Sequence, residues 1–156
     1  MASPTAGPEL AIVRSWLVDT GPLVAYLDAR DRAHGEVAAC LDSFSGQLST
    51  TSAVVTETMH FVAASPAGPR LLSEFVAASG LRIFDYSQAV PLGEAAALME
   101  KYADTPMDYA DATLVLLAET LGVLDVLTLD RRGFSIYRTR NRKPLRLVLD
   151  QPSDAG

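Results

Sequence analysis

The sequence predicts an α/β fold: a mainly parallel, roughly five-stranded central sheet with helices on both faces, in a three-layer α/β/α arrangement. Short apolar runs alternate with longer segments of helical periodicity along the chain. The connections between these segments are short, as in parallel sheets built from repeated strand–helix units. The 156 residues are enough for one domain with a sizeable core, and no internal repeat indicates a second domain.

The expected strands are the short apolar runs at residues 13–18, 47–50, 81–85, 125–129 and 145–149. The helical patterns between them span residues 22–30, 31–44, 53–64, 70–79, 91–102 and 105–121. We expect a single domain over residues 13–150. Residues 1–12 are rich in Ala, Pro, Gly and Ser and lack the basic and apolar regions of a signal peptide, so they are expected to form a disordered tail. Residues 151–156 are expected to form a C-terminal tail.

The composition indicates a folded protein that does not depend on disulfides or membranes. Hydrophobic residues make up 49% of the chain and charged residues 21%, which is typical of a compact domain. Cys40 is the single cysteine, which excludes an internal disulfide and fits a reducing, cytoplasmic location. No apolar run reaches the length of a membrane span. The net charge of −6 would repel membrane surfaces and, over the whole molecule, nucleic acid.

The stretch from Thr105 to Ala112 places two acids at the start of an apolar helix. Thr105 is the expected N-cap, and Pro106 suits the first helical position. Asp108 would then complete a capping box with Thr105, which accounts for this acid without a functional role. Asp111 would lie in the second turn, beside the apolar stripe, where no capping role is available to it. We therefore expect Asp111 to bind a cation.

Three further acids are candidates for the same site. Asp19 and Asp130 each follow an expected strand, and ligands of open parallel sheets bind beyond the carboxyl ends of the strands. A turn or a capping role remains the alternative for both. Glu57 lies within the helical pattern at 53–64, next to apolar positions, and its alternative is a solvated helix position.

The shared location of these acids predicts a divalent cation. If strands and helices alternate as expected, Asp19, Asp111 and Asp130 fall at one end of the sheet, where uncompensated carboxylates repel one another. Mg²⁺ takes one or two carboxylates and several waters, which would resolve this repulsion. His34 and His60 are far apart and form no pair at metal-ligand spacing, so the sequence disfavours a zinc site.

Four segments together resemble the PIN-domain ribonucleases, and most of all the VapC-like toxins of toxin–antitoxin pairs. They are Val-Asp-Thr-Gly-Pro-Leu-Val-Ala at 18–25, Thr-Glu-Thr around Glu57, Asp-Ala at 111–112, and Leu-Thr-Leu-Asp-Arg-Arg-Gly-Phe at 127–134. The resemblance covers residues 17–149. It lies in the order of the four acids, because no single segment is specific.

The resemblance implies a metal-dependent ribonuclease site made of Asp19, Glu57, Asp111 and Asp130, with Mg²⁺ or Mn²⁺ as the cofactor. Asp19 and Asp111 would be direct metal ligands, Asp130 would share the metal site, and Glu57 would complete the pocket. Thr20 and Thr128 match hydroxyl positions that support the acids. Asp108 is an additional acid that many members lack, and its participation in the metal shell stays open.

A basic segment near the C-terminus is the expected RNA contact. Between residues 131 and 146 the chain has no acid and seven of its thirteen basic residues, namely Arg131, Arg132, Arg138, Arg140, Arg142, Lys143 and Arg146. Tyr137, among them, could stack on a base. The alternative is a solvated loop, or a contact with an acidic segment of a partner.

Three functional hypotheses follow. The leading one is a Mg²⁺- or Mn²⁺-dependent ribonuclease with RNA as substrate, for which the resemblance implies a homodimer and, for a toxin, a small antitoxin partner. The second is a phosphoryl-transfer domain of another α/β type, such as a phosphatase. It is weakened because Gly21 stands where such enzymes need a second Asp. The third is a catalytically idle scaffold that binds a protein partner, disfavoured because all four acids are present.

Overall fold

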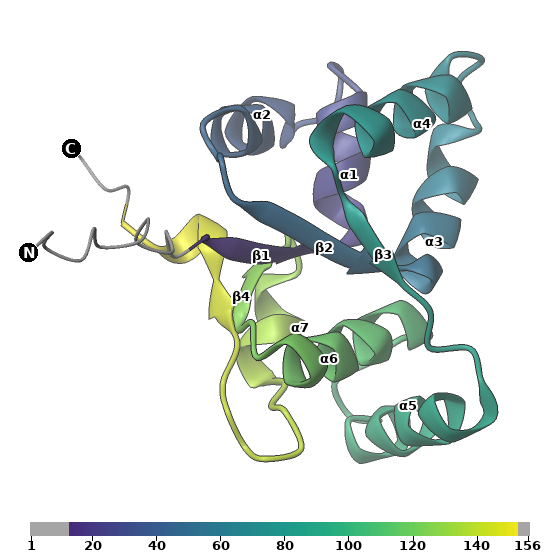
Figure 1. The fold of residues 1–156 in the computed structure, drawn as a ribbon, viewed down its shortest axis with the longest axis vertical. Coiled ribbons are helices and arrows are strands. Elements are labelled where there is room, and N and C mark those ends of the chain that lie inside the picture. The colour runs from purple at the N-terminus through teal and green to yellow at the C-terminus, as the bar shows by residue number, and fades with distance from the viewer. Residues whose placement is uncertain (1–12, 153–156) are drawn as a thin grey trace, which may run out of the picture.

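The strands of the computed structural model form one sheet in the order β3-β2-β1-β4-β5 (Figure 1). The structure describes residues 13–152. The strands are β1 (Ser15–Val18), β2 (Gln47–Thr51), β3 (Arg82–Phe84), β4 (Asp125–Leu127) and β5 (Arg146–Leu147). Every neighbouring pair is parallel, which confirms the predicted α/β class with a five-stranded sheet.

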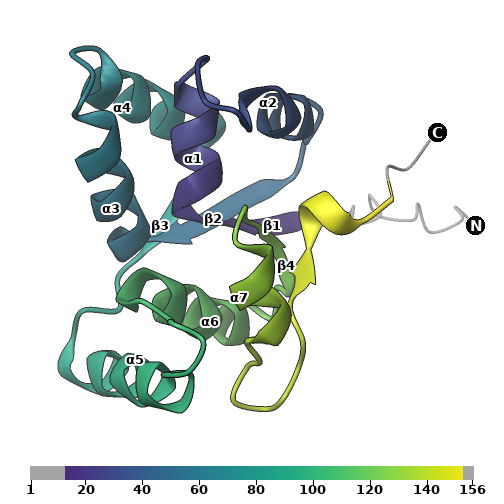
Figure 2. The ribbon, with the colours of Figure 1, turned by 180° about the vertical axis from the view of Figure 1, so that it is seen from behind.

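Helices cover the sheet on both sides. The helices are α1 (Thr20–Leu27), α2 (His34–Asp42), α3 (Ser52–Val62), α4 (Gly68–Ser79), α5 (Ala89–Lys101), α6 (Tyr109–Leu121) and α7 (Arg131–Ile136), and a 3₁₀ helix, η1, spans Val148–Asp150. Figures 1 and 2 show α1 to α4 on one side of the sheet and α5 and α6 on the other. The strand order reverses at β1, so β1 and β4 border the switch point where ligands of such sheets bind.

The core lies on both faces of β1 and around α6. Leu17 in β1 is opposite Ser49 on one side and Val126 on the other, and it is fully buried because helices cover both faces of the sheet. Helix α6 contacts β2, α3 and α5, and its residues from Ala110 to Ala118 are all buried. This helix is therefore apolar around most of its circumference. Asp111 lies within that buried run.

Most predicted bounds are shifted by up to three residues, and the structure differs most from the sequence prediction at three elements. The helix expected at 105–121 begins at Tyr109, because residues 102–106 form a turn in which the Thr105 N–H donates to the carbonyl of Tyr102 (3.0 Å). Helix α7 was not predicted. The strand expected at 145–149 divides into β5 and η1.

The predicted N-terminal tail, 1–12, lies outside the described residues, as do the last four residues, 153–156, of the predicted C-terminal tail. Gln151, also assigned to that tail, is described, and its side-chain amide donates to Asp125 (3.2 Å). Within residues 13–152, no helix combines the length and the apolar character that crossing a membrane requires.

Candidate active site

Asp19 stands at the carboxyl end of β1, at the switch point. Its N–H donates to the carbonyl of Leu127 at the end of β4 (3.0 Å), so both strand ends fix its backbone. Asp19 is also the N-cap of α1, where Oδ1 accepts from the Thr20 N–H (2.8 Å). The residue is buried, with 8% of its surface exposed.

Thr128 connects the two acids that follow β1 and β4. Its hydroxyl donates to Asp19 Oδ2 (2.8 Å) and accepts from the Asp130 N–H (3.0 Å). Thr128 is buried, so this link is shielded from water. The hydroxyl therefore orients the second oxygen of Asp19.

Asp108 and Asp111 share the first turn of α6, and the expectation that Thr105 caps this helix is wrong. Asp108 is the N-cap: its Oδ1 accepts from the Asp111 N–H (2.7 Å), and Asp111 Oδ2 accepts from the Asp108 N–H (3.1 Å). The two acids form a reciprocal capping box. Asp111 is therefore in the first turn rather than the second, and it is buried whereas Asp108 is exposed.

Buried threonines, which the sequence analysis did not single out, hold the elements around these acids together. The hydroxyls of Thr51 and Thr113 are hydrogen-bonded (2.7 Å), which joins the end of β2 to α6. Thr51 also caps α3, and the hydroxyl of Thr50 donates to the carbonyl of Val18 in β1 (2.7 Å). The Thr50-Thr51 pair at the end of a predicted strand was the only sequence signal for this network.

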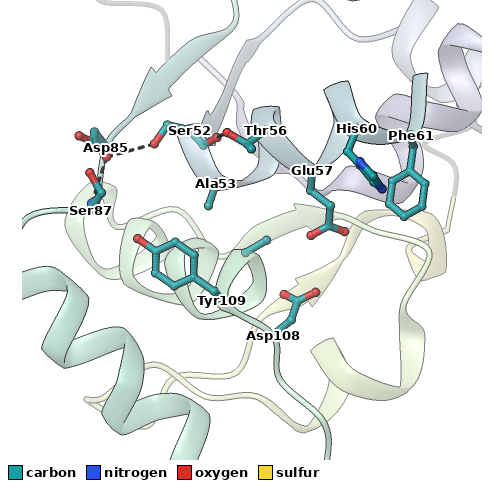
Figure 3. A pocket seen from close by; sticks show the side chains of 11 residues that line it. Ser52, Ala53, Thr56, Glu57, His60, Phe61, Asp85, Ser87, Asp108 and Tyr109 are labelled. Carbon is teal, nitrogen blue, oxygen red and sulfur yellow. Dashed lines mark hydrogen bonds between the residues drawn. The ribbon is translucent and has the colours of Figure 1, made fainter. Parts of the chain in front are cut away.

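Glu57 faces the acidic centre from α3. A cleft of about 740 Å³ lies between α3 and the start of α6, and Figure 3 shows the carboxylates of Glu57 and Asp108 pointing toward one another across it. Glu57 is half-buried, so a solvated helix position does not describe it. His60 and Phe61 line the same cleft one turn further along α3.

Asp130 follows β4 and is more exposed than Asp19 and Asp111. Its Oδ1 accepts from the Gly133 N–H (3.0 Å) and so caps the short helix α7, and the residue is exposed. A Cβ at position 133 would overlap Asp130 Oδ2, so only glycine allows this close approach. Asp130 thus has the capping role that the sequence left open, and the Thr128 hydroxyl links its N–H to the carboxylate of Asp19.

Burial raises the pKa values of Asp19, Asp111 and Glu57. Burial is the main cause that raises the pKa of Asp19 from 3.8 to about 6, and the charges of Asp108 and Glu57 raise it further. The hydrogen bonds from Thr128 and Thr20 act in the opposite direction and lower this pKa. For Asp111, burial and then the charges of Asp19 and Asp108 raise the pKa from 3.8 to about 8. The pKa of Glu57 is raised by burial and by Asp108. These shifts show that Asp19, Asp111, Asp108 and Glu57 belong to one electrostatic cluster.

The cluster fits a hard divalent cation held by two carboxylates. Within residues 13–152, no three carboxylate, imidazole or thiol groups are arranged to hold one ion together. The expected set of three ligands, Asp19, Asp111 and Asp130, therefore stays a prediction, and Mg²⁺ itself needs only one or two carboxylates together with several waters. The buried hydroxyl oxygen of Thr20, beside Asp19, has no hydrogen bond of good geometry within residues 13–152, and it lies close enough to Glu57 to lower the pKa of that carboxyl. A metal-bound water would satisfy it.

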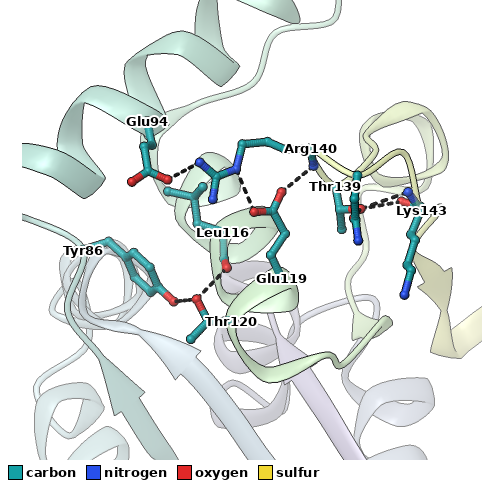
Figure 4. A network of polar contacts seen from close by, with 9 residues as sticks. Tyr86, Glu94, Leu116, Glu119, Thr120, Thr139, Arg140 and Lys143 are labelled. Atoms are coloured by element: carbon teal, nitrogen blue, oxygen red, sulfur yellow. Dashed lines mark hydrogen bonds and ion pairs between the residues drawn. The ribbon is translucent and has the colours of Figure 1, made fainter.

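Fewer side chains of the basic segment are available to contact RNA than the sequence suggested. Ion pairs join Arg131 to Asp150 and Glu36, Arg140 to Glu94 and Glu119 (Figure 4), and Arg146 to Asp125. The Arg138 guanidinium donates to three carbonyls, including that of Ser135 (2.9 Å), at the end of α7. The remaining side chains, those of Arg132, Arg142 and Lys143, are exposed and have no ion-pair partner among the described residues.

Tyr137 cannot stack on a base, contrary to the prediction from sequence. The residue is fully buried, packs edge-on against Phe134 and Tyr102, and donates its hydroxyl to the carbonyl of Pro106 (3.2 Å). It therefore belongs to the core that supports the turn before α6.

The capping box predicts different outcomes for two substitutions of Asp108. Asn caps helices as well as Asp, so Asp108→Asn should leave the free energy of unfolding nearly unchanged, whereas Asp108→Ala should lower it by about 1 kcal/mol. Any activity that depends on the acidic centre should fall far less in Asp108→Asn than in Asp111→Asn. Urea denaturation and a cleavage assay measure the two effects. Equal losses of activity in Asp108→Asn and Asp111→Asn would make Asp108 a ligand.

The fold and the acidic centre at its switch point define the class of this protein. A model of the PIN domain matches residues 16–140, so the chain belongs to the PIN-domain family. Ribonuclease VapC26 of Mycobacterium tuberculosis (strain ATCC 25618 / H37Rv) is 35% identical over 125 residues, which cover 78% of this chain and 91% of the relative. These findings confirm the resemblance to VapC-like PIN ribonucleases.

Two solved structures share the fold. Mycobacterium tuberculosis VapC20, a sarcin-ricin loop cleaving toxin, has a TM-score of 0.64 and 19% sequence identity, covering 76% of this chain and 92% of its own. VapBC2 from Rickettsia felis, bound to a DNA fragment from its promoter, has a TM-score of 0.57 and 14% identity, covering 86% and 97%. At these identities the likeness supports the fold alone.

Proposed function

We propose that this chain is a VapC-like ribonuclease that hydrolyses RNA phosphodiester bonds with Mg²⁺ or Mn²⁺. One observation carries the proposal: Asp19 and Asp111, both buried with raised pKa values, lie in one cluster at the switch point of a PIN fold. Buried carboxylates that repel one another are stabilised in their ionised form by a cation. The similarity to a relative named as a ribonuclease supports RNA as the substrate.

The side chains divide the chemistry between them. Asp19 and Asp111 would hold the cation, which supplies a more acidic bound water and stabilises negative charge on the phosphate. Thr128 and the Thr20 N–H orient Asp19, and the Asp108 N–H orients Asp111. Glu57 faces the cleft with a raised pKa, which suits a group that accepts a proton from the attacking water. Asp130 caps α7 through the Gly133 N–H, is linked to Asp19 by Thr128, and would add negative charge beside the cation.

Incubation of the purified protein with total RNA tests this function. We expect discrete cleavage products with Mg²⁺ or Mn²⁺, no products with EDTA, and recovery when the metal is returned in excess. Cleavage that persists in EDTA would overturn the metal-dependent mechanism.

The proposal extends to partners and location. A toxin of this kind would be held inactive by a small antitoxin, and the family resemblance supports a homodimer. We place its action in the cytoplasm, where its single cysteine would stay reduced. Size-exclusion chromatography with light scattering would distinguish a dimer from a monomer.

The three unpaired basic side chains give a prediction about RNA binding. Replacing Arg132, Arg142 and Lys143 with Ala should weaken RNA binding and reduce the slope of log K against log salt by about 2, since each lost phosphate contact contributes about 0.7 for a single strand. Binding isotherms at several salt concentrations measure the slope. The control is Arg30, Arg32 and Arg70 replaced with Ala, which removes the same charge from the side of the sheet covered by α1 to α4. If both triple variants keep the wild-type slope, these residues do not contact RNA.

A further inference from the structure

The acid-lined cleft has a second end that the proposed cleavage chemistry does not use. Asp85 follows β3 and lines the cleft together with Ser52 and Ser87 (Figure 3). Asp85 Oδ1 accepts from the Ser52 hydroxyl (3.1 Å) and from the Ser87 N–H (3.0 Å). Hydrogen bonds from Ser87 and Ser52 also lower the pKa of Asp85, so it remains a carboxylate. Asp85 is exposed, and both hydrogen bonds that are resolved within residues 13–152 reach Oδ1, with the Ser87 hydroxyl also close to the carboxylate.

The wall between this carboxylate and the catalytic acids is apolar and rigid. Ala53, Ala110 and the ring of Tyr109 line it, and Figure 3 shows the ring between Asp85 and Asp108. The Tyr109 hydroxyl donates to the carbonyl of Tyr86 (3.1 Å), which fixes the orientation of the ring. A fixed aromatic face beside small side chains is a surface on which a nucleobase stacks.

The spacing and the charges of the cleft favour a base over a phosphate. Ser52, which donates to Asp85, and Glu57 are five positions apart on α3, so about 7.5 Å of helix axis separates the two ends of the cleft. Asp85, Glu57 and Asp108 all line the cleft, so a second phosphate in it would be repelled whereas a neutral base would not. The cleft volume of about 740 Å³ accommodates one nucleotide.

We propose that this cleft is a base-recognition pocket that selects an unpaired guanine next to the scissile phosphate of single-stranded RNA, with Asp85 as the selecting acceptor. The proposal rests on the proposed ribonuclease function. The Watson–Crick edge of guanine presents two adjacent donors, N1–H and the N2 amino group, to the carboxylate. Adenine and cytosine place an acceptor nitrogen beside their amino group, and uracil places carbonyls on both sides of its N–H, so none of them can donate two hydrogen bonds to Asp85.

Binding without cleavage tests this pocket. In the Asp19→Asn background with EDTA, we would measure the fluorescence anisotropy of short oligouridines that carry one central guanosine, inosine, adenosine or cytidine. The guanosine oligomer is expected to bind at least about fivefold more tightly than the adenosine and cytidine oligomers. Inosine, which lacks the N2 amino group, should be intermediate.

Asp85→Asn in the same background should reduce the guanosine preference to less than about twofold. Asparagine keeps an acceptor for Ser52 and Ser87, so the variant should fold. Asp104→Asn is the matched control, because Asp104 is exposed and does not line the cleft. Equal binding of all the oligomers, or a guanosine preference that survives Asp85→Asn, would contradict the proposal that this cleft selects guanine. If the preference behaves as expected but wild type with Mn²⁺ cleaves none of the oligomers, the proposed ribonuclease function fails while the pocket stands.

Discussion

Asp19→Asn and Asp111→Asn should each lower metal-dependent RNA cleavage by at least about 10²–10³-fold while the fold is retained. Each substitution removes one of the two buried carboxylates that would hold the cation. Asparagine keeps the size and one acceptor oxygen, so the N-cap of α1 and the capping box of α6 should survive. The loss of activity should therefore reflect the missing charge rather than a disrupted helix.

Initial cleavage rates of a defined RNA measure this effect, with circular dichroism to verify the fold. Asp104→Asn, which removes an exposed carboxylate outside the cleft, should cleave at the wild-type rate. A wild-type rate in Asp19→Asn or in Asp111→Asn would remove that residue from the metal centre.

Much of the fold could be predicted because its signals are local. The alternation of short strands and helices along the chain predicts the parallel sheet. Asp19 directly follows a buried strand, so its position at the carboxyl end of the sheet can be predicted from that segment alone. The N-cap of α6 was predicted three residues too early, at Thr105 rather than Asp108, because Thr105 and Pro106 are themselves good helix starters. The turn after α5 uses both residues instead, and the Pro106 carbonyl accepts from Tyr137, which is distant in sequence.

The ion-pair partners of the basic segment could not be predicted from the sequence. Glu94 and Glu119, which pair with Arg140, lie on α5 and α6, so only the tertiary fold brings them to the segment. Helix α7 has only six residues, which are too few to show a periodic apolar pattern. The burial of Tyr137, which directly follows this helix, could therefore not be predicted. The role of Asp85 was also hidden, because Ser52 reaches it from another element.

In EDTA at pH 8, Asp111→Asn should be more stable than wild type by about 2–3 kcal/mol. Burial and the neighbouring acids raise the pKa of Asp111 from 3.8 to about 8, so ionising it costs more free energy in the folded chain than in the unfolded chain. At about 1.4 kcal/mol for each pKa unit, this difference has a ceiling of roughly 6 kcal/mol. Water entry from the cleft and local rearrangement should keep the gain well below that ceiling.

The same shifts fix the pH dependence of the metal-free protein. The folded pKa values of Asp19 and Asp111, about 6 and about 8, lie above the ordinary value of 3.8. Between about pH 4 and pH 8 the folded chain therefore binds more protons than the unfolded chain, and the contribution of these groups to stability increases as the pH falls through that range. The advantage of Asp111→Asn should be largest above pH 8 and absent below about pH 4.

Thermal melts of wild type and Asp111→Asn at pH 8, in EDTA and in saturating Mn²⁺, test most directly whether Asp111 belongs to a divalent-cation site. Mn²⁺ at a hundred times its dissociation constant should stabilise wild type by about 2.7 kcal/mol and raise its Tm by roughly 5–10 °C. Asp111→Asn should melt above wild type in EDTA and lose most of the metal-induced shift, while Asp104→Asn should follow wild type in both conditions. If Asp111→Asn melts below wild type in EDTA and still gains the full Mn²⁺ shift, Asp111 has a structural role and the cation binds elsewhere.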